Sequence, residues 1–284
     1  MLKTGIYSSA YFDLTNYEDG LKKMRAHGYQ CVDLQWFISP SSPFYTMDKP
    51  EFISCFKALK SAADKTGISV WQTHGLMPPD DSTEESRKDV LSRQEKVIIA
   101  AGILGCKFVV IHPAIPFGWG EEPSRETAFE ITAERFYNLL PTASSEGVTL
   151  CVENMPFGKG HSFSEIGDVK RLVTEINAYN LKICFDTGHC NVTGEDHYAA
   201  IKTLGKDLAC LHVHDDAARQ DRHLVPYQGE IDWEKVIKGL KEIGFDGCIS
   251  LETGDFTKMP EPMREEMRIS VAKISRYIAD KVGG

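Results

Sequence analysis

Hydrophobic and polar positions alternate along the whole chain between short extended runs and longer amphipathic stretches. The extended runs predict eight strands, at residues 3–9, 31–37, 69–75, 107–113, 148–155, 181–189, 208–215 and 248–254. The amphipathic stretches between them predict eight helices, at residues 16–27, 49–66, 82–104, 124–146, 162–176, 196–206, 232–243 and 261–282. Several of these helices begin with Ser or Asp before acidic residues and end at glycine, which is typical of helix caps.

Eight strand and helix pairs in 284 residues predict the α/β class and, within it, a single (β/α)8 TIM barrel. The competing architecture is a doubly wound open sheet, but no Gly-rich phosphate-binding turn follows the first predicted strand. No linker, low-complexity run or short repeat interrupts the pattern, so we expect one domain over residues 1–284. The longest irregular connections follow strands, which places them at the carboxyl-end mouth of the barrel, at residues 39–48, 114–123 and 215–230.

Four predicted strands carry a residue that can bind a metal ion at their carboxyl ends. LKICFDTGH predicts a short apolar strand that ends in the Asp186 carboxylate, followed by a Thr-Gly turn and His189. Cys184 and Asp186 face one side of the strand, while Ile183 and Phe185 face the other. The same spacing of a small residue and a ligand-type residue recurs in TLCVENM, LACLHVHD and CISLETG, and the four ligand-type residues are Glu153, Asp186, His212 and Glu252. In a closed barrel these side chains converge at one end, over a narrow interior of small residues.

Six of the nine histidines lie at or just after predicted strand ends, namely His74, His112, His189, His212, His214 and His223. With Glu153, Asp186, Asp221 and Glu252 they form a ring of oxygen and nitrogen ligands that suits a divalent cation. Each histidine alone is also compatible with a structural hydrogen bond. Several convergent ionisable groups need a counterion, however, and this predicts a metal centre.

Two carboxylates across one metal ion suit proton abstraction next to a carbonyl group. The cation would polarise the carbonyl and hydroxyl oxygens and stabilise an enediolate, while one carboxylate removes a proton and the other returns one. Glu153 and Glu252 are the candidates by position. The alternative is that both residues only bind the metal.

Aromatic residues near the predicted mouth offer surfaces for the apolar face of a sugar, and these are Trp36, Phe37, Trp71, Phe117 and Trp119. Core packing is the alternative for each of them, and it is weakest for Trp119, because glycines flank this residue on both sides. Arg222 in the DRH motif is a candidate for holding a substrate oxygen or phosphate. Its alternative role is that of a solvated loop charge.

Composition limits the class of partner. The net charge of −9 argues against a surface for phosphate backbones, so no nucleic acid is expected. The N-terminus has no apolar core of signal-peptide length, and the longest apolar run, VIIAAGILG, is too short to span a bilayer, so we expect no membrane association and a cytoplasmic location. The eight cysteines include no CxxC pair and predict reduced, mostly buried thiols. Apolar residues of the last predicted helix are a candidate contact in a homo-oligomer, namely Met263, Met267, Ile269, Val271 and Ile274.

The ordered set VENMP, FDTGH, HVHD followed by DRHLVPYQGEIDW, and SLET resembles the xylose isomerase-like TIM-barrel superfamily of sugar isomerases, epimerases and related dehydratases. The resemblance covers essentially the whole chain. It implies one divalent metal ion, commonly manganese, magnesium, cobalt or zinc, bound by Glu153, Asp186, His212 and Glu252. In the ketose 3-epimerase branch, the two glutamates also exchange the substrate proton and a histidine matching His189 contacts the sugar. An arginine soon after the third ligand is also used there; the loop HDDAARQDRH departs from that pattern, and Arg219 and Arg222 are the two candidates for the role.

Endonuclease IV, a DNA repair enzyme, shares this barrel and binds three zinc ions through nine ligands. All nine have a counterpart in this sequence, at His74, His112, Glu153, Asp186, His189, His212, Asp221, His223 and Glu252. The acidic composition and the GEIDW segment favour the sugar-active branch. We therefore expect a metal-dependent sugar or sugar-phosphate isomerase or epimerase with a small-molecule substrate contacted by His74, His112, His189, Arg222, His223 and Trp119. The alternatives are a sugar-acid or inosose dehydratase on the same metal site, the nuclease, and a barrel that binds sugar or metal without turnover.

Overall fold

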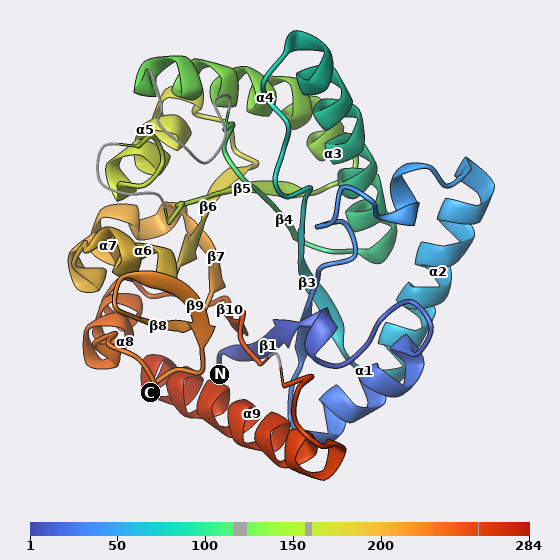
Figure 1. Cartoon of the computed structure of the whole chain (residues 1–284), viewed down its shortest axis with the longest axis vertical. Coiled ribbons are helices and arrows are strands. Elements are labelled where there is room, and N and C mark those ends of the chain that lie inside the picture. The colour runs from blue at the N-terminus through green and yellow to red at the C-terminus, as the bar shows by residue number, and fades with distance from the viewer. Residues whose placement is uncertain (116–123, 157–160, 255) are drawn as a thin grey trace.

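The computed structural model describes residues 1–115, 124–156, 161–254 and 256–284. Eight parallel strands form its central sheet: β1 (Lys3–Tyr7), β2 (Cys31–Leu34), β3 (Ser69–His74), β4 (Phe108–Ile111), β5 (Thr149–Glu153), β6 (Leu181–Asp186), β7 (Leu208–His212) and β10 (Cys248–Leu251). Their order is β10-β1-β2-β3-β4-β5-β6-β7. The two end strands meet through Val213, whose N–H donates to the Ser250 carbonyl at 2.9 Å and whose carbonyl accepts from the Glu252 N–H at 3.0 Å. The predicted TIM barrel is confirmed (Figure 1).

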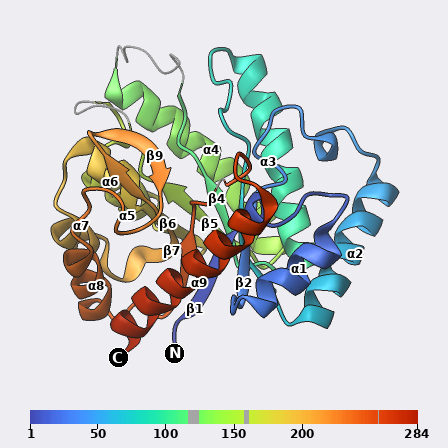
Figure 2. The ribbon, with the colours of Figure 1, turned by 60° about the horizontal axis from the view of Figure 1, so that its bottom comes forward.

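Helices surround the barrel on its outside, as Figures 1 and 2 show. They are α1 (Tyr17–Ala26), α2 (Lys49–Thr66), α3 (Glu84–Leu104), α4 (Arg125–Ser145), α5 (Ile166–Ile176), α6 (Thr187–Thr193), α7 (His197–Leu204), α8 (Trp233–Glu242) and α9 (Glu261–Gly283), with short 3-10 turns at Ser8–Ala10, Pro43–Tyr45 and Gly205–Asp207. Side-chain caps fix several starts, because Asp48, Ser124 and Asp232 each accept a hydrogen bond from the backbone N–H three residues later. Gly67 and Gly105 end α2 and α3 in the left-handed conformation.

Two local elements differ from the sequence prediction. Strand β6 ends at Asp186 as predicted, but a short helix, α6, begins where the Thr-Gly turn was expected, because the Asp186 carboxylate accepts the His189 N–H at 2.7 Å and caps this helix. The long connection after β7 contains an antiparallel hairpin of β8 (Asp215–Ala217) and β9 (Gln220–Leu224), where we expected irregular structure. Both elements stand at the mouth.

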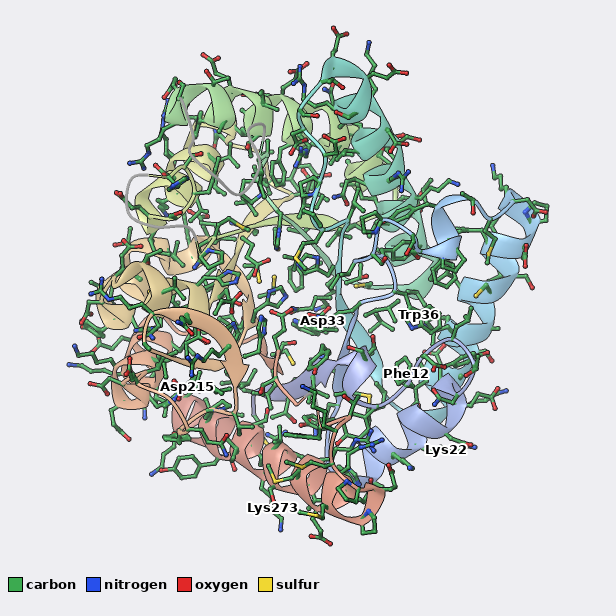
Figure 3. All side chains as sticks on the ribbon, viewed as in Figure 1. Phe12, Lys22, Asp33, Trp36, Asp215 and Lys273 are labelled. Carbon is green, nitrogen blue, oxygen red and sulfur yellow. The ribbon has the colours of Figure 1, made fainter. Side chains whose placement is uncertain are left out.

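The barrel interior changes in character along its axis. At the amino ends of the strands, Trp71 packs with Cys31 and Cys248, and the ammonium groups of Lys3 and Lys107 lie 4.3 and 4.8 Å from its ring centroid. A second group of small residues follows, formed by Val110, Cys151, Cys184 and Cys210. All cysteines in the described residues are free thiols, as expected. Figure 3 shows Asp33 inside the barrel, whereas Lys22 and Lys273 point outward from the helices.

The outer core explains several residues proposed above for the mouth. Phe37 is fully buried, and Trp36 stacks on Phe44 with ring centroids 5.4 Å apart, so core packing is the role of both. Trp71 lies at the opposite end of the barrel from the mouth. In α9, Val271 is completely buried in the core, while Met263 is exposed. Within the described ranges, no helix is long and apolar enough to cross a membrane.

Candidate metal centre

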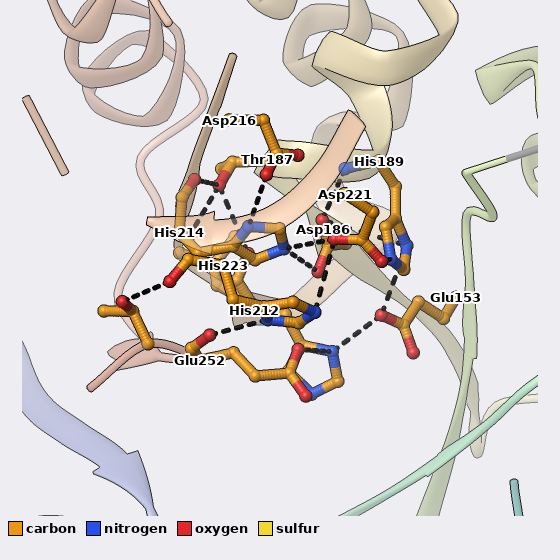
Figure 4. Close-up of polar contacts among 12 residues, drawn as sticks. Glu153, Asp186, Thr187, His189, His212, His214, Asp216, Asp221, His223 and Glu252 are labelled. Carbon is orange, nitrogen blue, oxygen red and sulfur yellow. Dashed lines mark hydrogen bonds and ion pairs between the residues drawn. The ribbon is translucent and has the colours of Figure 1, made fainter. Parts of the chain in front are cut away.

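The four predicted ligands meet at the carboxyl ends of their strands. Glu153 ends β5, Asp186 ends β6, His212 ends β7 and Glu252 follows β10. One ligand atom of each lies within 4.8 Å of the corresponding atoms of the other three. Glu153, Asp186 and His212 are buried, whereas the Glu252 side chain is 13% exposed. The geometric basis of the sequence prediction, convergence of separate strand ends, is present (Figure 4).

Glu153 lies among imidazoles. Its Oε1 is 2.7 Å from His212 Nδ1, and its Oε2 is 3.1 Å from His112 Nε2 and 3.4 Å from His74 Nε2. Burial alone would raise the pKa of Glu153, but the charge of His212 and the neighbouring His112 imidazole outweigh burial and hold that pKa well below its ordinary value. Glu153 is therefore an ionised carboxylate at neutral pH, even though it is almost completely buried.

Glu252 has a different environment. Its Oε1 accepts a hydrogen bond from Gln35 Nε2 at 3.0 Å, and its Oε2 lies 3.3 Å from His212 Nδ1. Glu252 also borders a cavity of about 630 Å³ at the mouth, together with Tyr7, Gln35, Met77, His223 and Phe256. Of the two predicted proton carriers, Glu252 is the one that faces this open space.

Asp186 is held from three sides. Its backbone is bracketed by the Asn154 side chain, whose amide oxygen accepts the Asp186 N–H at 2.9 Å and whose amide nitrogen donates to the Asp186 carbonyl at 3.0 Å. Its Oδ1 caps α6, and its Oδ2 lies 3.0 Å from His214 Nε2. Gly188 of the FDTGH motif is required here, because a Cβ at this position would collide with the His214 ring. The VENMP and FDTGH motifs thus fix one ligand jointly.

The hairpin of β8 and β9 brings further ligand-type residues to the same place. Asp221 lies 3.5 Å from His189 Nε2 and 3.2 Å from His223 Nε2, and His223 stacks on His214 with ring centroids 4.1 Å apart. Burial lowers the pKa of His189, but the Asp186 charge and the Asp221 hydrogen bond outweigh it and raise this pKa to about 9. Two further groups of ligand atoms lie within 4.8 Å of one another. One comprises His214, Asp221 and His223, and the other comprises Asp186, His189 and His214.

Asp215 anchors the connection that carries this hairpin. Its buried carboxylate accepts hydrogen bonds from the backbone N–H of Asp216, Tyr227 and Ile231 and from the indole N–H of Trp233, at 2.8 to 3.1 Å. One side chain therefore satisfies donors along the whole HDD…GEIDW segment. This explains how a polar loop holds a defined position over the ligands.

The residues predicted to contact a substrate divide into three sets. His223 and Arg222 line the mouth cavity, and the Arg222 guanidinium is also bound by the Gln220 side chain at 2.6 and 3.1 Å. His74, His112 and His189 are buried around Glu153 and Asp186. Trp119 and Phe117 lie outside the described residues.

Three further residues of the site were not identified from the sequence. They are Gln35, Asp33 and Gln72, which contact Glu252, His212 and Asp33, respectively. The signal for Asp33 was present in the run CVDL, since alternation from Cys31 turns this acidic side chain toward the interior. Its contact with His212 joins β2 to β7 across the barrel, and no local pattern in the sequence indicates that contact.

A family model described as "Xylose isomerase-like TIM barrel" matches residues 21–273. An uncharacterized protein of Methanocaldococcus jannaschii is 31% identical, covering 96% of this chain and 92% of that protein. A D-psicose 3-epimerase of Ruminiclostridium cellulolyticum is 24% identical over 88% of this chain and 83% of its own length. An inosose isomerase of Bacillus licheniformis is 24% identical over 93% and 94%, respectively.

Solved structures share the fold. A D-tagatose 3-epimerase-like protein superimposes with a TM-score of 0.79 at 22% identity, covering all of both chains. The IolI protein, solved with a bound zinc atom, superimposes with a TM-score of 0.78 at 19% identity and covers 99% of this chain and 98% of that one.

Proposed function

This chain belongs to the xylose isomerase-like TIM barrel family and, with sugar epimerases and an inosose isomerase among its relatives, is an enzyme; we propose that it is a divalent-metal-dependent sugar isomerase or epimerase. The reaction proposed is proton abstraction next to a carbonyl group. The observation that carries the proposal is the convergence of Glu153, Asp186, His212 and Glu252 at the mouth of the barrel. Convergent buried carboxylates without a cation would repel one another.

The residues present fit a divalent cation. Three carboxylates and one imidazole supply oxygen and nitrogen donors of the kind that manganese, cobalt, zinc and magnesium accept. Buried Glu153 Oε2 forms no well-directed hydrogen bond to any described residue, although two imidazoles lie nearby, so it retains a free acceptor direction. When bound, a cation at this position would polarise the carbonyl and hydroxyl oxygens of a sugar and offset the negative charge that develops on deprotonation.

The two glutamates are the proposed proton carriers. Glu252 borders the mouth cavity and is oriented by Gln35, so it can reach a sugar carbon in that space. Glu153 lies on the buried side of the ligand cluster, where the imidazoles keep it ionised. Carboxylates on two sides of one site allow one to remove a proton and the other to return it, which is the requirement for epimerisation.

The substrate is proposed to occupy the mouth cavity. His223 and Arg222 border it and supply polar contacts, and Tyr7 and Phe256 provide aromatic surface on its other walls. His74 and His112 are assigned to orienting Glu153, because their Nε2 atoms face its Oε2. The acidic net charge of −9 and the size of the cavity favour a small sugar over a nucleic acid.

A nuclease is the second candidate, because the nine residues that match endonuclease IV are gathered at one mouth, in and around the ligand groups described above. Metal stoichiometry separates the candidates, since the sugar enzyme is expected to hold one ion and the nuclease three. An abasic-site duplex tests nicking directly. A dehydratase on the same site would release water and yield a product of lower mass.

The experiment is a panel of ketoses, aldoses and their phosphates incubated with the enzyme and added Mn²⁺ or Co²⁺ in deuterated water. The expected result is a new sugar of unchanged carbon skeleton that carries deuterium at the carbon next to the carbonyl. Products without deuterium, or no product with any sugar while the abasic duplex is nicked, would contradict the proposal.

A further inference from the structure

His212 presents its two ring nitrogens to different surroundings. Nδ1 faces the ligand cluster, at 2.7 Å from Glu153 Oε1 and 3.3 Å from Glu252 Oε2. Nε2 faces the barrel interior, at 3.2 Å from Asp33 Oδ2. From this geometry we propose that Asp33 is a positioning residue for the metal centre, which holds Nε2–H of His212 so that Nδ1 is the metal-binding nitrogen. The inference deepens the proposed function and rests on the metal centre assigned there.

Asp33 is a carboxylate in a buried position inside the barrel. It lies on β2, a strand that supplies none of the four proposed ligands, and it is only 1% exposed. A buried carboxylate is costly unless it is paired and hydrogen-bonded. Within the described residues, Gln72 Nε2 donates a hydrogen bond to Asp33 Oδ2 at 3.0 Å, and the His212 ring lies within ion-pair distance of the same oxygen, at 3.2 Å. His212 Nε2 and Asp33 Oδ1 have no other hydrogen-bond partner among these residues, so the ring is the group available to offset the carboxylate charge.

Gln72 fixes the position of Asp33. Its Nε2 is also 3.2 Å from the Leu211 carbonyl, the residue before His212, so the amide connects β2 to β7 across the barrel. Gln72 reaches this place because of a β-bulge in β3. Val32 pairs with Val70 and Asp33 with Gln72, so Trp71 is the extra residue and both Trp71 and Gln72 face inward.

The chemical consequence follows from the imidazole. A neutral imidazole has one N–H donor and one nitrogen lone pair. Carboxylates lie at both nitrogens of His212, but a cation shared with Glu153 and Glu252 would take the Nδ1 lone pair, which leaves the proton on Nε2, facing Asp33. With the proton on Nε2, the lone pair of Nδ1 points between Glu153 and Glu252. The carboxylate also increases the basicity of the ring and restricts its rotation, and loss of such a partner weakens metal affinity by about 10- to 100-fold in known sites.

The test is Co²⁺ binding, measured by titration calorimetry and by the visible absorption of the bound ion, in the wild-type protein and in Asp33→Asn. The amide keeps the shape of the side chain but removes its charge. We expect Asp33→Asn to bind Co²⁺ with the wild-type stoichiometry, a Kd raised by about 10- to 100-fold and a changed absorption spectrum. The matched control is Ser275→Ala, which removes a buried hydrogen bond to the Ile249 carbonyl on the outside of the barrel and should leave both readouts unchanged.

Wild-type affinity and spectrum in Asp33→Asn would overturn the role of Asp33 and leave the proposed function intact. Absence of Co²⁺ binding by the wild-type protein would overturn the metal centre and this inference together. If Asp33→Asn does not fold, nitrogen-15 NMR of the Zn²⁺-loaded wild-type protein decides. A His212 ring protonated at Nε2 supports the inference, and one protonated at Nδ1 refutes it; the His212→Gln variant assigns the signal.

Discussion

Replacing each glutamate by glutamine tests the proposed roles of Glu153 and Glu252 in metal binding and proton transfer. Glu153→Gln and Glu252→Gln preserve shape but remove a ligand charge and a proton carrier together. A positioned general base contributes about 10²- to 10⁴-fold to a rate, so we expect a loss of about 10³-fold or more for each, which is about 4 kcal/mol in the activation free energy. We expect a similar loss of rate in both variants, although Gln35 contacts Glu252 whereas His74 and His112 contact Glu153.

The assay measures deuterium incorporation into the sugar found in the substrate panel, at Mn²⁺ concentrations that saturate each variant. Saturation removes the contribution of weakened metal binding and leaves the proton-transfer defect. Glu230→Gln is the control, because this exposed carboxylate lies in the same mouth connection and accepts a hydrogen bond from the Ala218 N–H, at 3.1 Å, away from the proposed ligands. Retention of more than about a tenth of wild-type exchange by either site variant would refute the assignment of that glutamate as a proton carrier.

Three further outcomes are expected. Mn²⁺ or Co²⁺ at about 100 times Kd should stabilise the protein by about 2.7 kcal/mol and raise Tm by about 5 °C, and a chelator should reverse the rise; a Tm indifferent to both would argue against a native-state metal site. In metal-free protein, the raised pKa of His189, about 9, stabilises the fold by about 3 kcal/mol below pH 6.5. That contribution is lost as pH rises through 9, so denaturant titrations of the wild-type protein should show a fall in the free energy of unfolding that is absent in His189→Asn. Equal falls in both proteins would contradict this prediction. Asp215→Ala should lower the free energy of unfolding in urea by about 2 to 4 kcal/mol, because it leaves buried N–H donors unpaired, and a loss below about 0.5 kcal/mol would refute its role as an anchor.

The barrel was predictable because its signal repeats. Eight extended runs alternate with eight amphipathic stretches, and each repeat supports the same architecture even where one boundary is wrong. The boundary errors have local causes. The Thr-Gly turn predicted after Asp186 is the start of α6, because the Asp186 side chain caps this helix. The hairpin of β8 and β9 has a polar sequence that resembles a loop, and the Asp215 hydrogen bonds that order it join residues distant in sequence.

The four proposed ligands were predictable because each combines strand alternation with a strand end. Asp33 shares the alternation but lies in the interior of the barrel, and its importance depends on β2 and β7 facing each other across a closed barrel. Trp71 shows the opposite error. An aromatic residue near a strand end suggested the mouth, whereas the bulge and the pairing of its strand place it with Cys31 and Cys248 at the other end.

The layer beneath the proposed ligands explains why their strands have small residues two positions earlier. Cys151, Cys184 and Cys210 precede Glu153, Asp186 and His212 by two positions and fill the barrel directly below them, with Val110. Burial raises the pKa of all three thiols well above the ordinary value, so they stay neutral and add no charge under a cluster that already holds several carboxylates. A larger side chain in this narrow layer would push the ligands apart, and a charged one would change the electrostatic balance on which His212 and Glu153 depend. The two-residue alternation therefore places the ligands at the mouth and small neutral residues directly beneath them. Strand β2 supplies no ligand, but its Asp33 carboxylate lies beside Nε2 of His212, on the side of the ring away from the ligand cluster.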